Sequence, residues 1–335
     1  MNVSAAKRDL GLIGAGYWGK NLARNFHALG VLHTICDAES SVLAAYQNGY
    51  ELVRKSNQAE DLLQATEINK VAIAAPAAMH YRLARAALLA GKDVFVEKPL
   101  CLKEEEGDDL VALAEQQKRV LMVGHLLQYH PAIETLKTII ARGELGKLYY
   151  LTSNRLNLGK IRREENALWS FAPHDISVIL SLVGLPEHVR CVGEAYLRDG
   201  VPDTTLMMLT FPDRVRAHAY VSWLNPFKEQ KLTIVGSSGM AVFDDTLPWK
   251  EKLVVHRDHV MWVRGQTPTP SKSSGEAVHI PEVEPLSVEC RHFLDRCADR
   301  SRPLTDGTEG LRVLRVLRAA QTSLESGGEL VALKR

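Results

Sequence analysis

The segment "DLGLIGAGYWGKNLARNFHALG" (residues 9–30) constrains the fold of this 335-residue chain more than any other. It runs from an apolar strand pattern, through Gly14, Gly16 and Gly19, into a helical pattern that stops at Gly30. Glycines at this spacing allow a tight turn, a close backbone approach to a pyrophosphate, and close helix–strand packing. The context predicts a dinucleotide site rather than an ordinary glycine turn, with backbone N–H groups at the helix N-terminus holding the phosphates.

Asp37 ends the next apolar run, "VLHTICD". A carboxylate at this position can accept hydrogen bonds from both hydroxyls of an adenosine ribose and would repel a 2′-phosphate. The following "AESS" contains no Arg or Lys that could bind a 2′-phosphate. We therefore predict NAD(H) rather than NADP(H), with Tyr17 and Trp18 of the glycine turn beside the cofactor or packed against the protein.

The strand and helix patterns alternate over the first third of the chain. The runs "KVAIAAP" (70–76), "DVFVEKP" (93–99) and "RVLMVGH" (119–125) are near-continuous apolar strands separated by helical stretches, a pattern typical of a parallel sheet covered on both faces. Longer strands joined by turns follow. We expect an α/β fold with an N-terminal Rossmann domain for NAD (1–127; doubly wound, mostly parallel sheet). A C-terminal α/β domain (128–335) should have an open, mostly antiparallel sheet and serve substrate binding and oligomerisation.

Lys98 stands at the end of the strand in "DVFVEKPLCL", between a glutamate and a proline. The carboxyl ends of parallel strands line the ligand crevice, and Pro99 biases Lys98 toward an extended backbone. We therefore expect the Lys98 ammonium near the nicotinamide, rather than in a surface pair with Glu97. Other residues at strand ends that should lie beside the cofactor are Pro76, His80, Glu97 and His125.

Several short motifs together resemble those of the glucose–fructose oxidoreductase/inositol dehydrogenase/MocA (Gfo/Idh/MocA) family. They are "GAGYWG", "AAPAAMH", "VEKPL", "VGHLLQYHP" and "PHDISVILSLVG", and the likeness extends nearly end to end. The resemblance implies a Rossmann domain, a second domain with an open sheet, and hydride transfer between nicotinamide and a sugar or cyclitol carbon. It also implies that Lys98 and His174 are catalytic. Many members carry an aspartate four residues before that histidine, where this chain has Ser170, so the division of labour between Lys98 and His174 stays open.

The segment "NRLNLGKIRREENALWSFAPHD" (154–175) most resembles family members that oxidise C3 of UDP-linked N-acetyl sugars. This implies oxidation of UDP-N-acetylglucosamine to its 3-keto derivative, followed by a PLP aminotransferase in a 3-amino-sugar pathway of lipid A or surface polysaccharide. Arginines and lysines of the segment could meet a diphosphate and its asparagines a hydroxyl or acetamide, although a solvated loop with cancelling charges is the alternative. The expected substrate-binding residues, with Lys160 and Arg163 as further candidates for the diphosphate, are Lys98, Gln128, Tyr129, Arg155, Asn157, Arg162, His174 and Asp175.

Other functions are compatible with the same residues. One alternative is oxidation of UDP-N-acetylglucosaminuronic acid, whose carboxylate an arginine of the segment could bind. Another is oxidation of an inositol or a hexose. A non-catalytic NAD/sugar sensor is a third, but a sensor needs the pocket and not the base, so Lys98 and His174 together favour an enzyme.

Composition excludes several other classes of function. The formal net charge of +1 offers no general attraction for nucleic acid or an anionic membrane. The five cysteines form no Cys-x-x-Cys pair, which suits a reducing, cytoplasmic location. No cysteine or further histidine supports a metal site at His256 and His259, so no metal site is expected. The open sheet predicts a homodimer or homotetramer.

Overall fold

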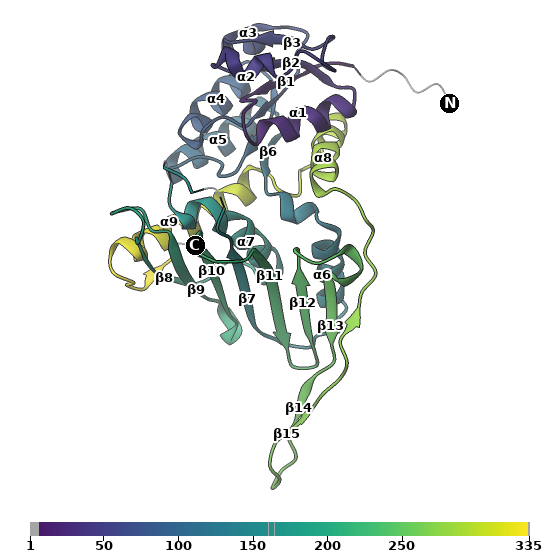
Figure 1. The fold of residues 1–335 in the computed structure, drawn as a ribbon, viewed down its shortest axis with the longest axis vertical. Helices are drawn as coiled ribbons and strands as arrows, with labels where there is room; N and C mark the ends of the chain where they lie inside the picture. Colours follow the sequence, from purple (N-terminus) through teal and green to yellow (C-terminus); the bar gives the residue numbers. More distant parts are fainter. Residues whose placement is uncertain (1–6, 160, 164, 334–335) are drawn as a thin grey trace. The chain divides into compact units, whose positions relative to one another are not determined.

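The chain divides into two compact units (Figure 1). The computed structural model describes residues 7–159, 161–163 and 165–333. Unit 1 comprises Met1–Tyr129 and Glu284–Leu314, and unit 2 comprises His130–Val283 and Arg315–Arg335. The chain thus returns to unit 1 late, whereas the sequence analysis assigned every residue after 127 to the second domain.

Unit 1 contains a six-stranded sheet in the order β3-β2-β1-β4-β5-β6, and each described pair of strands in it is parallel. Strands β1, β5 and β6 are buried along their whole length, which explains their near-continuous apolar sequences. The predicted doubly wound, parallel sheet is therefore confirmed. Its strands are β1 (Leu10–Ile13), β2 (Leu32–Cys36), β3 (Arg54–Ser56), β4 (Lys70–Ile73), β5 (Asp93–Glu97) and β6 (Leu121–Gly124).

Helices α1 and α8 pack side by side on one face of this sheet (Figure 1). Three aromatic rings join them to β5: Phe26 lies 6.3 Å from Phe95 and 6.5 Å from Phe293, and Phe95 lies 5.8 Å from Phe293. This shared core is the reason that the segment containing α8 belongs to unit 1. The helices are α1 (Gly19–Ala28), α2 (Ser40–Ala44), α3 (Ala59–Gln64), α4 (Ala77–Leu89), α5 (Glu104–Gln117), η1 (Leu126–Tyr129), α8 (Pro285–Asp299) and α9 (Gly307–Glu325), the last of which continues into unit 2.

Unit 2 contains a nine-stranded sheet in the order β16-β13-β12-β11-β7-β10-β9-β8-β17. Strands β7 and β10 pair in parallel and their described neighbours pair antiparallel, so the prediction of an open, mostly antiparallel sheet is confirmed. The strands are β7 (Leu148–Leu156), β8 (His188–Glu194), β9 (Thr204–Thr210), β10 (Arg216–Ser222), β11 (Glu229–Gly236), β12 (Met240–Asp244), β13 (Leu253–His256), β16 (Glu276–Ala277) and β17 (Val331–Ala332).

One face of the second sheet is covered by helices and the other is open. Along β10, Ala217, Ala219 and Val221 are buried, while His218 and Tyr220 are half-buried on the opposite face, as strand alternation requires. Helix α7 packs against β7, β9 and β10. The remaining helical segments of unit 2 are α6 (Pro131–Ala141), α7 (Ala167–Val183), η2 (Pro212–Arg214) and η3 (Trp249–Glu251).

The Pro- and Ser-rich segment 264–277 is exposed, but it is not the simple loop that its composition indicates. Strand β15 (Thr269–Ser271) pairs antiparallel with β14 (His259–Met261), and β16 adds to the edge of the main sheet. Pro270 is tolerated because a two-stranded ribbon has edges that need no N–H donor. In the described part of the chain, no helix combines the length and apolar character needed to span a bilayer.

Candidate active site

Two glycines of the turn after β1 are packed closely against backbone atoms, and a third faces open space. Gly14 has φ +87°, and a Cβ atom there would lie 2.5 Å from the backbone N of Ala75. A Cβ atom on Gly19 would overlap the carbonyl oxygen of Gly14. Beside Gly16, no described atom lies within 4 Å of the Cβ position. Bare backbone facing open space at the start of a helix fits the approach of a pyrophosphate.

Asp37 connects the end of β2 to this turn. Its Oδ2 accepts a hydrogen bond from the backbone N–H of Ala15 at 2.8 Å, and its Oδ1 accepts one from Glu39 N–H at 3.0 Å. The hydroxyl of Tyr46 donates to the Ala15 carbonyl at 2.7 Å, so both backbone groups of Ala15 are held. A carboxylate has about four acceptor sites, which leaves sites on half-buried Asp37 for ribose hydroxyls. These residues fit the adenosine part of NAD.

We expect Asp37→Arg to weaken NAD⁺ binding by about tenfold to a hundredfold, because charge-assisted hydrogen bonds of ~1.5–3 kcal/mol are lost. The guanidinium would also provide a partner for a 2′-phosphate, so the ratio of the NADP⁺ to NAD⁺ dissociation constants should fall. Fluorescence titration with both cofactors measures this ratio, with Glu105→Arg, a change at an exposed position of α5, as the matched control. An unchanged ratio, or a wild-type preference for NADP⁺, would contradict this role of Asp37.

His80 joins the ends of two neighbouring strands beside Lys98. Its ring is buried, with Nδ1 lying 2.7 Å from the Pro99 carbonyl oxygen and Nε2 lying 2.8 Å from the Ala75 carbonyl oxygen. The imidazole thus holds the turn after β5, which begins at half-buried Lys98, against the turn after β4. Pro76, also predicted beside the cofactor, is exposed at the start of α4.

Glu97 and His125, both predicted near the cofactor, are buried and hydrogen-bonded. Trp18 donates its indole N–H to Glu97 Oε1 at 2.5 Å, and His125 Nδ1 lies 2.5 Å from Glu309 Oε2. Burial raises the pKa of Glu97 to about 7, although the Trp18 N–H and the Lys98 ammonium favour its ionised form. Trp18 is therefore attached to the end of β5, whereas Tyr17 is exposed on the turn.

Two residues predicted to bind substrate lie in the core of unit 1. Gln128 and Tyr129 of η1 are buried, and the Tyr129 hydroxyl lies 2.8 Å from Thr305 Oγ1. Since that hydroxyl is used inside the unit, Tyr129 is a poor candidate for a substrate ligand. The motif "VGHLLQYHP" matches the family whether the Tyr129 ring points to a ligand or to the core. The resemblance alone therefore could not locate this ring.

Helix α7 of unit 2 carries His174 and its neighbours. Asn166 caps the helix by accepting a hydrogen bond from Trp169 N–H at 3.1 Å. His174 is half-buried in the middle of the helix. Buried Ser170 precedes it by four residues and therefore lies on the same side, one turn away. The position where many family members carry a carboxylate thus holds a hydroxyl next to the imidazole.

Arg155 and Asp175 form a buried ion pair, which the sequence analysis did not anticipate. Arg155 donates from Nε to Asp175 Oδ2 at 2.8 Å and from Nη2 to Asp175 Oδ1 at 3.0 Å. Ser153 Oγ also donates to Asp175 Oδ1, at 2.8 Å. Burial disfavours the guanidinium, but the Asp175 charge outweighs it, so the pKa of Arg155 is raised. Arg155 is therefore a poor candidate for a diphosphate ligand, and Asp175 for a sugar ligand.

We expect Asp175→Asn to lower the free energy of unfolding by about 3–5 kcal/mol, because it leaves the Arg155 guanidinium buried without a counter-charge. Urea unfolding followed by circular dichroism measures the loss. Asp199→Asn, which changes an exposed aspartate of the same unit, should leave stability nearly unchanged. Equal stabilities of the two variants would show that the pair contributes little.

The other predicted substrate residues lie after β7. Asn157 donates its backbone N–H to Ser222 O at 3.1 Å, and its side chain is half-buried. Arg162 lies 3.0 Å from Glu165, as the cancelling-charge alternative requires, while the Arg163 side chain is exposed. Lys160 lies outside the described residues. Arg162 and Arg163 therefore stay as candidates for a diphosphate.

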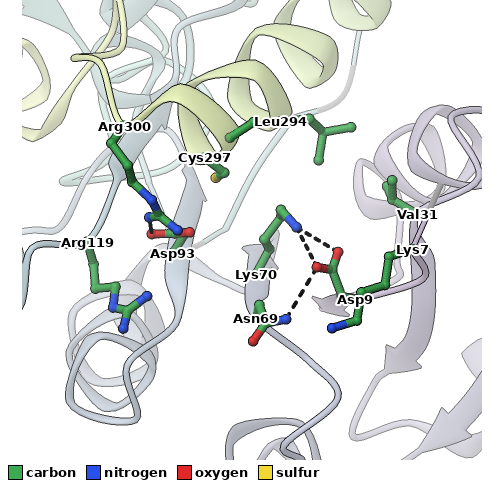
Figure 2. Close-up of a pocket in the computed structure, with 11 residues that line it drawn as sticks. Lys7, Asp9, Val31, Asn69, Lys70, Asp93, Arg119, Leu294, Cys297 and Arg300 are labelled. Carbon is green, nitrogen blue, oxygen red and sulfur yellow. Dashed lines mark hydrogen bonds and ion pairs between the residues drawn. The ribbon is translucent and has the colours of Figure 1, made fainter. Parts of the chain in front are cut away.

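A pocket of about 320 Å³ lies at the amino ends of strands of the unit 1 sheet, opposite to the ends that carry the glycine turn and Lys98 (Figure 2). Its residues Asp9, Lys70 and Asp93 stand at the amino ends of strands, whereas the glycine turn and Lys98 follow carboxyl ends. Lys70 lies 2.7 Å from Asp9, and Arg300 lies 2.7 Å from Asp93, so most of its charges neutralise one another in pairs. This pocket is not the candidate active site.

Comparisons with known proteins bear on the whole chain. The model of an oxidoreductase family with an NAD-binding Rossmann fold matches residues 8–125, and the GFO/IDH/MocA C-terminal domain matches residues 133–242. The UDP-N-acetylglucosamine 3-dehydrogenase of Acidithiobacillus ferrooxidans is 28% identical over 321 residues, which cover 94% of this chain and 97% of that protein.

Solved structures share the same fold. A structure of the Acidithiobacillus enzyme has a TM-score of 0.81 at 25% identity, covering 96% of this chain and 98% of that one. Levoglucosan dehydrogenase in complex with NADH and levoglucosan has a TM-score of 0.84 at 20% identity, covering 98% and 99%. The WlbA dehydrogenase from Bordetella pertussis, in complex with NADH and UDP-GlcNAcA, has a TM-score of 0.79 at 21% identity, covering 98% and 99%.

The predicted family, cofactor and enzyme class are therefore confirmed. The glycine turn and Asp37 fit NAD, and one matched family domain lies in each unit. This chain belongs to the Gfo/Idh/MocA family and is an NAD-dependent sugar oxidoreductase.

Proposed function

We propose that this protein oxidises the C3 hydroxyl of a UDP-linked N-acetyl sugar, first of all UDP-N-acetylglucosamine, to the 3-keto derivative. The observation that carries the proposal is the likeness to the Acidithiobacillus UDP-N-acetylglucosamine 3-dehydrogenase, which spans 94% of this chain without a large unmatched region. The arginines that follow β7 are consistent with a diphosphate in the substrate.

Unit 1 holds the cofactor in this proposal, through Gly14, Gly16, Gly19 and Asp37, and bound NAD⁺ supplies the hydride acceptor. Unit 2 supplies the substrate-binding residues, with Arg162 and Arg163 on the diphosphate. This division extends the two-domain prediction, with the difference that α8 belongs to the cofactor unit.

His174 and Lys98 have separate roles in the proposed chemistry. An alcohol does not lose its proton at neutral pH without a base within hydrogen-bond reach, and the His174 imidazole is that base. The Lys98 ammonium donates a hydrogen bond to the same oxygen and stabilises its developing negative charge. Because Ser170 offers only a hydroxyl, no carboxylate at that position makes the imidazole more basic, so the reaction depends more on Lys98 than in relatives with the aspartate.

A panel of sugars tests the substrate. The purified protein with NAD⁺ should produce NADH, followed by its near-ultraviolet absorbance, with UDP-N-acetylglucosamine and not with free N-acetylglucosamine. UDP alone should compete. Faster turnover of UDP-N-acetylglucosaminuronic acid would change the substrate but keep its class. Turnover of a free inositol or hexose alone would overturn the nucleotide-sugar proposal, and binding of NAD⁺ without turnover of any sugar would favour a sensor.

The oligomeric state and the next reaction belong to the same proposal. The open face of the unit 2 sheet carries exposed or half-buried apolar residues, which are Val192, Leu206, Met208 and Tyr220. We propose that this face pairs with another copy of the chain to form a homodimer or homotetramer. Light scattering measures the oligomeric state.

A 3-keto sugar is a substrate for transamination, so a PLP aminotransferase should consume the product.

A further inference from the structure

Glu289 is a carboxyl group inside the apolar core of unit 1. It is 0% exposed and lies on the buried face of α8 with Leu286, Cys290 and Phe293. Among the residues that the structure describes, neither of its carboxyl oxygens has a hydrogen-bond partner. An isolated ionised carboxylate in such surroundings is strongly disfavoured, so its presence calls for a specific explanation.

The packing of α8 on β5 places Glu289 beside Glu97. The rings of Phe95 and Phe293 are in contact, with 5.8 Å between their centroids. Glu97 lies on the same face of β5 two residues after Phe95, about 7 Å along the strand. Glu289 lies one helical turn before Phe293, about 6 Å along the helix. Cys297, two helical turns after Glu289, interacts with Asp93 at the start of β5, so α8 runs antiparallel to β5 and Glu289 lies on the Glu97 side of the two rings. The two carboxyl groups are close enough for the charge of Glu97 to act on Glu289.

Glu97 is in turn attached to the glycine turn. It accepts the Trp18 indole N–H at 2.5 Å, and Trp18 directly precedes α1. A Cβ atom on Gly124 would lie 2.9 Å from Glu97 Oε2, so the absence of a side chain on Gly124 leaves room for this carboxyl group. Glu97 thus lies between Glu289, on which its charge acts, and Trp18 of the glycine turn, to which it is hydrogen-bonded.

The Lys98 ammonium offsets the charge of Glu97, whereas the charges that act on Glu289 are those of two carboxylates, Glu97 and Glu309. No group of three or more metal-ligating side chains is arranged to hold a metal ion in the described ranges. Glu309, which also faces the pair, is bound to His125. The titratable and charged groups around the two carboxyls are Lys98, His125, Tyr129, Cys290 and Glu309.

We propose that Glu289 keeps a proton and forms with Glu97 a buried carboxyl pair of single negative charge, which holds Trp18 and thereby positions the glycine turn for NAD. Glu289 is a positioning residue, because it acts on the cofactor through Glu97 and Trp18. Two adjacent carboxylates in a low-dielectric core do not both ionise, so one proton is retained. Burial, and then the charges of Glu97 and Glu309, raise the pKa of Glu289 well above its usual value. The inference depends on NAD binding and not on which sugar is oxidised.

The retained proton makes stability depend on pH with a definite sign. In the unfolded chain Glu289 ionises near its ordinary pKa of 4.5, whereas the folded chain keeps it protonated to higher pH. Its contribution to stability is therefore complete below that value and is lost as pH rises through the folded pKa. Above about pH 7, where Glu97 is already ionised in both states, unfolding still releases the Glu289 proton.

Glu289→Gln removes this proton release and keeps the size of the side chain. Above about pH 7, the unfolding equilibrium constant of the wild type should rise about tenfold more per pH unit than that of the variant, until Glu289 ionises in the folded state. Urea unfolding at each pH measures the slopes. Asp295→Asn, an acid-to-amide change on the exposed face of α8, should keep the wild-type slope. Equal slopes for wild type and Glu289→Gln would overturn the proposal.

The positioning role has a separate test in NAD⁺ binding, measured by calorimetry without any sugar. At neutral pH, Glu289→Gln should bind NAD⁺ within about twofold of wild type, because an amide N–H can donate to the Glu97 carboxylate as the proposed protonated Glu289 does. Glu289→Leu, which cannot donate, should bind about tenfold more weakly, equivalent to the ~1.4 kcal/mol of a lost hydrogen bond. A purely structural role predicts that leucine suits the apolar site and leaves NAD⁺ affinity unchanged, and that result would overturn positioning.

A measurement on the wild type keeps the proposal testable if the variants do not fold. Infrared spectroscopy of the protein labelled with ¹³C-glutamate should show a protonated carboxyl band at neutral pH that resists exchange with heavy water. Absence of that band would overturn the proposal. The sugar assay can succeed or fail independently, because none of these three experiments contains a sugar.

Discussion

Replacing Lys98 by methionine is expected to lower kcat by about 10²–10⁴-fold while leaving the dissociation constant of NAD⁺ within about threefold. Methionine keeps the length and the apolar stem of the side chain but has no ammonium to stabilise a developing alkoxide. Lys98 follows the carboxyl end of β5, and the turn that it begins is held by His80. The groups that fit the adenosine and the pyrophosphate lie elsewhere, at Asp37 and the glycine turn, so ground-state cofactor binding should survive.

Lys103→Met is the matched control for this variant. Lys103 lies five residues later in the same turn, with its side chain 71% exposed, and should retain wild-type kcat. Turnover is followed by NADH formation with UDP-N-acetylglucosamine, and NAD⁺ affinity by fluorescence titration. Wild-type turnover in Lys98→Met would remove Lys98 from the chemistry, and a large loss of NAD⁺ affinity would make it a cofactor ligand instead.

Replacing His174 by alanine should lower kcat by a similar factor of about 10²–10⁴ and also change the pH dependence of the reaction. Protonation of an imidazole base lowers kcat/KM at acidic pH, and this acidic limb should disappear when the imidazole is removed. Because His174 lies on α7 of unit 2, NAD⁺ affinity, which unit 1 provides, should be unchanged. The combination of lost turnover, lost acidic limb and retained cofactor binding identifies a base.

The exposed His279 provides the control, since His279→Ala removes an imidazole from the same unit without effect on turnover. Retention of the acidic limb in His174→Ala would transfer the role of base to Lys98 or to another group. Comparing Lys98→Met with His174→Ala also shows how the chemistry is divided between these two residues when Ser170 replaces the family aspartate. A larger loss for Lys98→Met than for His174→Ala would show that the chain relies mainly on the ammonium.

Local patterns predicted the main elements of the fold because each pattern has a direct steric cause. The run from Val94 to Val96 is buried on both faces in β5, as its apolar sequence requires, and Gly14 has the positive φ that a tight turn imposes. The return of Glu284–Leu314 to unit 1 was not predictable in this way. The spacing of Leu286, Phe293 and Cys297 shows that a helix face is buried, but it does not show which sheet covers it.

The site was predictable where residue type and chain position agree, and less so where a partner is distant in sequence. Arg155 shares the inward face of β7 with Leu151 and Ser153, so strand alternation alone indicated burial rather than a diphosphate contact. Its partner Asp175 is on α7, which no local pattern reveals. Glu289 had a similar signal that was missed: a glutamate at a core position of an amphipathic helix.

The discontinuous construction of unit 1 has a consequence for the order of events during synthesis. Phe26 and Phe95 leave the ribosome early, but their third partner, Phe293, is made only after all the main strands of the unit 2 sheet except β17. During translation of the unit 2 strands, the core of the nascent nucleotide-binding unit therefore stays incomplete, and part of its apolar surface stays exposed. Truncating the gene before α8 should give an aggregating fragment rather than a small independent NAD-binding module.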